Sequence, residues 1–249
     1  PQDVLEQQFD FRYKSNTKIY PQLRPDKAGL DLALEILKEA KRPILLVESG
    51  IARCEALNEV VQFAELTGSG VYQAWMSDVN FPVTHPQYLG DLDPTSPQAK
   101  DIFKDKDLLI GIGCSLFGQG FFNPEPTLSP NMRIIQIDEN PWEIGKNFPV
   151  DFGLQGDIKA VLAELNELIE KRVPLRVREK AKDRTKEIAQ EKSGLNGQLK
   201  IQIENEKDHV PISISRLMVE IKEAMSPNTV IVDECWSSSG MLRQVLDLT

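Results

Sequence analysis

The sequence predicts an α/β fold with a parallel sheet of about six strands and helices on both faces. Short apolar runs, rich in branched residues, alternate with longer segments whose apolar residues recur at helical spacing. Consecutive parallel strands need a connection long enough for a helix, so this alternation implies right-handed helical crossovers. The pattern extends over residues 25–171, where we predict a Rossmann-like domain.

The predicted elements follow one another at short intervals in this domain. They are helix Asp26–Ala40, strand Pro43–Glu48, helix Cys54–Leu66, strand Gly70–Ala74, helix Ala99–Phe103, strand Asp107–Ile112, strand Ile134–Ile137 and helix Ile158–Leu168. Gly68 is expected to end the second helix, and Asp157 to cap the last one. Trp75–Pro97 is rich in proline and glycine and is expected to be irregular. After Asp138 we expect a short helix, opened by Asn140-Pro141, and a second short strand.

The segments on either side of this domain have a different composition. Residues 1–24 show no sustained period and are predicted to be an entry linker. Residues 172–210 are dense in charges of both signs, which is typical of a solvated helix or a loose linker, and we expect a break at Gly194–Gly197. Residues 211–249 are predicted to start a second, incomplete α/β unit.

In that second unit we expect helix Ile214–Met225, strand Thr229–Val232 and helix Gly240–Leu248. The first residue is Pro rather than Met, and the chain stops after one amphipathic segment. We therefore expect this chain to be an excerpt from a longer polypeptide.

Charge and composition argue against several classes of function. A net charge of −9 is unfavourable for binding nucleic acid or an anionic membrane. The apolar runs are too short to span a bilayer, and the start of the chain has no secretory leader. Cys54, Cys114 and Cys235 have no CxxC spacing, which favours reduced thiols and a cytoplasmic location. No metal-ligand spacing and no Ser-His-Asp arrangement emerges, so no catalytic or metal-binding residue is predicted.

The first candidate binding site follows the strand Asp107–Ile112. Gly111 and Gly113 lie at its end, where glycine lets backbone amides approach a phosphate. Asp138 lies at the tip of the next strand, where a ribose-binding acid would stand. The spacing GxGx₄GxG, which ends at Gly118 and Gly120, departs from GxGxxG, so both a structural turn and a nucleotide site remain open.

The second candidate is the hydroxyl-rich loop at residues 233–240, DECWSSSG, between a predicted strand and a helix. Such a loop at a helix N-terminus suits an anion such as a diphosphate. The alternative is an ordinary helix cap by Ser237.

Several ordered motifs resemble those of one enzyme family. The longest is IQIDENPWEIGK at Ile135–Lys146, followed by the GD of Gly156-Asp157 and a final helix. AKRPILLVESG, NFPVTHPQYLGDL and KDKDLLIGIGCSL precede it in the expected order. Together they resemble the central domain of thiamine-diphosphate-dependent enzymes, the family of benzoylformate decarboxylase, pyruvate decarboxylase and acetolactate synthase. The tail resembles the start of that family's diphosphate-binding domain, and His85 falls in a structural motif of the central domain.

The resemblance implies a fragment of a 2-oxo acid decarboxylase similar to benzoylformate decarboxylase, with the central domain as a scaffold. Thiamine diphosphate and Mg²⁺ would be bound by the full-length homo-oligomer, and Ser237, Ser238 and Trp236 would lie at the diphosphate. The catalytic Glu and the GDG…N motif of the family are missing here, so the fragment alone is expected to be inactive and to bind no cofactor. The central domain holds FAD in acetolactate synthases and ADP in oxalyl-CoA decarboxylases. A flavin-containing carboligase and a non-catalytic nucleotide-binding module are therefore the alternatives.

Overall fold

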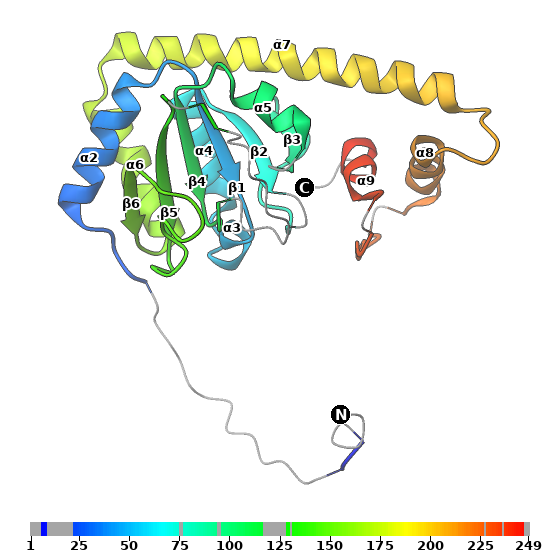
Figure 1. The fold of residues 1–249 in the computed structure, drawn as a ribbon, viewed down its shortest axis with the longest axis horizontal. Coiled ribbons are helices and arrows are strands. Elements are labelled where there is room, and N and C mark those ends of the chain that lie inside the picture. The colour runs from blue at the N-terminus through cyan, green and yellow to red at the C-terminus, as the bar shows by residue number, and fades with distance from the viewer. Residues whose placement is uncertain are drawn as a thin grey trace.

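A six-stranded parallel sheet forms the core of the central domain (Figure 1). The computed structural model describes residues 6–8, 22–74, 77–93, 96–116, 128–129, 131–226, 228–235 and 237–246. The strand order is β3-β2-β1-β4-β5-β6, and all five pairings are parallel. The strands are β1 (Pro43–Val47), β2 (Gly70–Ala74), β3 (Tyr88–Leu92), β4 (Leu108–Ile112), β5 (Arg133–Asp138) and β6 (Phe152–Gln155). The predicted fold class is confirmed.

Helices cover both faces of this sheet. The described helices are α2 (Lys27–Glu39), α3 (Gly50–Arg53), α4 (Leu57–Thr67), α5 (Pro97–Phe103), α6 (Ile158–Arg172), α7 (Leu175–Glu206), α8 (Ile214–Ala224) and α9 (Ser239–Val245), and α2, α4 and α6 cover one face of the sheet while α5 lies on the other. The side chains of β1 alternate between two buried clusters: Leu45 and Val47 join α2, α4 and α6, whereas Ile44 and Leu46 join the cluster that contains Phe103 of α5. This is why the central strands read as continuous apolar runs.

Three predictions within the central domain are wrong. The segment expected to be irregular contains β3, which the pattern hid because Gly90 has a φ of 123° and the β2–β3 register shifts beside it. The helix expected from Cys54 begins at Leu57 instead, because Glu55 adopts a positive φ of 51° and separates α3 from α4. Asn140-Pro141 opens a series of turns rather than a helix.

The linker and the tail also differ from expectation. No break occurs at Gly194–Gly197, and α7 continues through both glycines as a single helix of 32 residues. Thr229–Val232 forms no strand: Val230 and Val232 are 86% and 90% exposed. Within the described residues this segment pairs with no strand, and a strand needs hydrogen-bonded neighbours to be stable.

The first half of α7 is anchored on the central domain. Ala181 packs against Gly68 at the end of α4, where an added Cβ would lie 2.3 Å from the Ala181 carbonyl oxygen. Arg184 donates hydrogen bonds to the carbonyl oxygens of Thr67 (2.6 Å) and Gly68 (3.3 Å), and so satisfies carbonyls that the end of α4 leaves free. The second half extends past β3 toward α8 (Figure 1).

At the far end of α7 a small apolar cluster joins α8 and α9, with Met218, Leu242, Val245 and Leu246 buried and Ile203 of α7 packed against them. From there α9 returns to the edge strand β3. Arg243 of α9 donates a hydrogen bond of 2.6 Å to the Ser77 carbonyl oxygen and lies 3.6 Å from the Asp91 carboxylate. The second unit therefore contacts the central domain through α7 and through α9.

Candidate functional site

The first candidate site lies where the strand order reverses, at the carboxyl ends of β1 and β4. In open α/β sheets ligands bind at this kind of switch point. The strand ends bring Glu48, Gly113 and Asp138 to one edge of the sheet. The structure therefore places two of the three predicted nucleotide-site residues there, whereas Gly111 lies within β4.

The glycines at this edge bring two backbones into contact. The amide of Gly50 donates a hydrogen bond to the Gly113 carbonyl oxygen at 3.1 Å. Gly113 has a φ of +61°, and an added Cβ would lie 2.6 Å from the Cα of Gly50. At Gly111 an added Cβ would lie 2.8 Å from the Cys114 sulfur. In the structure, these glycines accommodate close internal packing.

At this edge the side chain of Asp138 is buried and that of Glu48 is partly buried. Asp138 is 1% exposed, and its Oδ1 accepts a hydrogen bond from the Asn140 amide at 2.8 Å. Burial raises the pKa of Asp138 to about 6, although that hydrogen bond and the positive charge of Arg53 oppose the shift. Burial also raises the pKa of Glu48, which accepts a hydrogen bond from the Ser115 amide at 3.1 Å.

This electrostatic environment suits a diphosphate poorly. The Arg53 guanidinium lies 3.5 Å from the Glu139 carboxylate and is already paired. A diphosphate at this edge would face the carboxylates of Glu48 and Asp138, which repel it. Gly118 and Gly120 of the motif lie outside the described residues, and the nucleotide site at Gly111, Gly113 and Asp138 stays a prediction.

The side chain of Gln136 organises this edge and was missed by sequence reasoning. It is fully buried, and its amide donates hydrogen bonds of 2.8 Å to the carbonyl oxygens of Cys114 and Glu143. Its Oε1 accepts a third, of 2.8 Å, from the Gly145 amide. The signal was present, because a glutamine inside a β-branched strand must find partners when buried.

The second candidate site is the loop before α9. Ser237 is exposed, and Ser238, not Ser237, occupies the N-cap position, although its side chain makes no capping hydrogen bond. Asp233 organises the loop: its Oδ1 accepts hydrogen bonds from the Cys235 amide (3.0 Å) and the Ser239 hydroxyl (2.9 Å). Trp236 lies outside the described residues, and the role of Ser237, Ser238 and Trp236 at a diphosphate stays a prediction.

His85 packs in the loop before β3. Its ring lies edge-on to Phe81, and its Nδ1 accepts a hydrogen bond from the Gln87 amide at 3.2 Å. Among the described residues no three His, Cys, Asp or Glu side chains are grouped to hold a metal ion, and no helix is long and apolar enough to cross a membrane.

Sequence comparison identifies close relatives. Residues 30–165 match the family model described as "Thiamine pyrophosphate enzyme, central domain". An acetolactate synthase from Mycobacterium avium is 32% identical over 173 residues, which cover 68% of this chain and 28% of that protein. The chain thus spans less than a third of the length of this relative.

Solved structures agree on the fold. A benzoylformate decarboxylase from Polynucleobacter necessarius superposes with a TM-score of 0.74 at 22% identity, covering 100% of this chain and 43% of that one. A 4-hydroxybenzoylformate decarboxylase from Rhodococcus jostii gives a TM-score of 0.68 at 16% identity, covering 94% of this chain and 40% of that one. Because the family model matches more than half of its residues, this chain belongs to the thiamine pyrophosphate enzymes and contains their central domain.

Proposed function

We propose that this chain supplies the scaffolding central domain of a thiamine-diphosphate-dependent 2-oxo acid decarboxylase that resembles benzoylformate decarboxylase. The observation that carries the proposal is the contact between Gly50 and Gly113. It joins the loops after β1 and β4 by backbone at the switch point of the sheet, and the carboxylates of Glu48 and Asp138 lie at the same edge. We infer that a domain with this tight contact and these acids at its switch point holds other domains in place rather than a flavin.

The chemistry would belong to the longer protein. There thiamine diphosphate, held with Mg²⁺, would serve as the electron sink for the carbanion left when CO₂ departs. Ser237, Ser238 and Trp236 would lie beside its diphosphate, and the enzyme would be a cytoplasmic homo-oligomer. In this proposal residues 25–171 are the central domain, residues 172–210 the linker and residues 211–249 the start of the cofactor domain.

A second candidate is an acetolactate synthase-like carboligase with FAD in the central domain. It is favoured by the 32% identity to acetolactate synthases. It requires the carboxyl ends of β1 and β4 to accept a flavin.

Thermal unfolding with added ligands separates the two. The chain is heated alone and with FAD, ADP, NAD, or thiamine diphosphate plus Mg²⁺, each at increasing concentration. A ligand present at about 100 times its Kd adds about 2.7 kcal/mol of stability, which shifts the Tm visibly. The scaffold proposal expects no shift with FAD or ADP. A saturable shift with FAD would overturn it and support the carboligase.

Assays of the longer polypeptide test the activity itself. Release of CO₂ with formation of an aldehyde is expected for a decarboxylase, and formation of a new carbon–carbon bond for a carboligase.

A further inference from the structure

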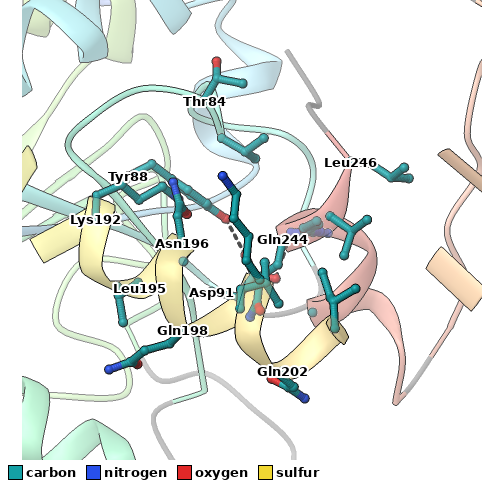
Figure 2. Close-up of a pocket in the computed structure, with 18 of the residues that line it drawn as sticks. Thr84, Tyr88, Asp91, Lys192, Leu195, Asn196, Gln198, Gln202, Gln244 and Leu246 are labelled. Atoms are coloured by element: carbon teal, nitrogen blue, oxygen red, sulfur yellow. Dashed lines mark hydrogen bonds and ion pairs between the residues drawn. The ribbon is translucent and has the colours of Figure 1, made fainter. Parts of the chain in front are cut away.

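A cavity lies away from the carboxyl ends of β1 and β4, between β3, the second half of α7, α8 and α9 (Figure 2). Its volume is about 740 Å³, which is in the range of small-molecule sites. The cavity joins the central domain to the second unit, because its walls come from both. Of the two candidate sites described above, only Gly240, the last residue of the second, borders it.

The charge of Lys192 is the main feature of this cavity. Its ammonium lies 5.0 Å from the centre of the Tyr88 ring, and Figure 2 shows both side chains at one end of the pocket. Burial lowers the pKa of Lys192, and no carboxylate of the described residues pairs with it. A half-buried ammonium that lacks a counter-charge attracts anions, and the face of an aromatic ring compensates it only in part.

The acid of the cavity is already engaged. Asp91 accepts a hydrogen bond of 2.7 Å from the Tyr88 hydroxyl and lies 3.6 Å from Arg243. It therefore does not neutralise Lys192. Lys200 and Lys222 also line the cavity, so its lining carries more positive than negative charge.

The remaining lining offers neutral donors and apolar surface. The amides of Asn196, Gln202 and Gln244 border the cavity, and Leu199 and Val219 supply apolar contact. A ligand that fits has one charged end and an apolar body.

We propose that this cavity binds a small organic anion, with its carboxylate or phosphate group at Lys192 and its apolar body against Leu199 and Val219. The cavity that holds the ligand is lined by β3, α7, α8 and α9, so binding stabilises the docking of the second unit on the central domain. This inference does not rest on the proposed function, since it involves neither the carboxyl ends of β1 and β4 nor the loop before α9.

Nuclear magnetic resonance of the ¹⁵N-labelled chain tests the proposal. The side-chain amides of Asn196, Gln202 and Gln244 report directly on the cavity during titration with benzoate, phenyl phosphate or the neutral benzyl alcohol. Saturable shifts are expected with at least one anion and not with the alcohol. The anion with the lower Kd shows whether the site prefers a carboxylate or a phosphate.

Variants then test whether the charge of Lys192 binds the anion. Lys192→Met is expected to weaken binding about tenfold, the usual effect of losing a charge-assisted hydrogen bond. Lys192→Arg keeps the charge and should keep most of the affinity. Lys182→Met, at an exposed position of the same helix, is the matched control and leaves the Kd unchanged. Equal shifts with benzyl alcohol, no saturation with either anion, or an unchanged Kd in Lys192→Met would each overturn the proposal.

Discussion

The backbone amide of Gly50 lies 3.1 Å from the carbonyl oxygen of Gly113, and this hydrogen bond joins the loops that follow the two central strands, β1 and β4. Neither residue has room for a side chain. A Cβ on Gly50 would lie 2.4 Å from the Cα of Gly113, which is backbone and cannot turn aside. The contact therefore depends on glycine at both positions.

Replacing Gly113 by alanine should lower the free energy of unfolding by about 2–4 kcal/mol, because the new Cβ adds left-handed strain to an overpacked contact. Urea unfolding measures the change. Gly194→Ala is the matched control: it lies inside α7 with nothing within 4 Å of the added Cβ. That change should stabilise the protein by about 0.5–1 kcal/mol. A Gly113→Ala protein as stable as the wild type would show that the two loops can separate freely.

The buried carboxyl of Asp138 should make stability depend on pH. Its pKa is raised to about 6 in the folded chain, above its value in the unfolded chain, so the folded state binds the proton more tightly. The resulting stabilisation is present below about pH 4 and is lost as the pH rises to about 6.

Asp138→Asn removes this titration. The stability of the wild type relative to the variant should fall by about 2 kcal/mol between pH 4 and pH 7. Urea unfolding of both proteins across this range measures the difference, and any constant offset cancels. A difference that is flat with pH would mean that Asp138 ionises normally in the folded chain.

The buried amide of Gln136 should be important for the loop that follows β5. Gln136→Leu leaves the Gly145 amide and two carbonyl oxygens without their partner, at a cost of about 2–4 kcal/mol. Hydrogen exchange should show faster exchange at Gly145. Gln155→Leu, at an exposed position of β6, serves as the control and should change stability by less than about 0.5 kcal/mol. Equal effects of the two changes would contradict the role given to Gln136.

A helix or strand could be predicted from the sequence where the residues of that element alone determine it. The branched apolar run of β5 and the Asp157 cap of α6 are local, and both were predicted. Strand β3 was missed because it is stabilised by pairing with β2 and not by its own composition. The strand predicted at Thr229–Val232 is wrong for the opposite reason. The composition of this segment favours a strand, but it pairs with no strand among the described residues.

The same distinction applies to the candidate site. The glycines and Asp138 were singled out from their spacing, and the structure does place Gly113 and Asp138 at the switch point of the sheet. Sequence could not show that Gly113 faces Gly50, because that contact joins residues 63 positions apart. For Gln136 the sequence indicates that a buried amide needs partners, but it does not show which backbone groups, 7, 9 and 22 positions away, provide them.

Removing the Arg184 guanidinium should loosen the first half of α7. Arg184→Met loses hydrogen bonds to two carbonyl oxygens at the end of α4, which is expected to cost about 1.5–3 kcal/mol. Hydrogen exchange should rise around Ala181 and leave β4 unchanged. Lys182→Met, two positions away on the exposed side of the same helix, tests whether loss of any positive charge on α7 has this effect. Its hydrogen exchange and stability should match those of the wild type. Unchanged exchange at Ala181 would show that apolar packing alone anchors the helix.

The pair of Asp91 and Arg243 should determine how firmly α9 is docked. Both side chains are nearly buried, so Asp91→Asn leaves the guanidinium without its counter-charge, at a cost of about 2–4 kcal/mol to the docking of α9. Faster hydrogen exchange at Leu242 would report the loss. Asp101→Asn on the exposed side of α5 is the control. Unaltered exchange at Leu242 in Asp91→Asn would mean that the apolar cluster alone holds α9.

The length of α7 has a mechanical consequence. From Arg184 to its last residue the helix extends about 33 Å, so a tilt of only about 5° at Arg184 would displace the far end by about 3 Å. Such a lever would leave the second unit free to swing. The contact of Arg243 with Asp91 gives the second unit another attachment to the central domain, besides the one that α7 makes at Gly68. With both contacts in place the second unit cannot swing without breaking one of them, so α7 and α9 together set its orientation.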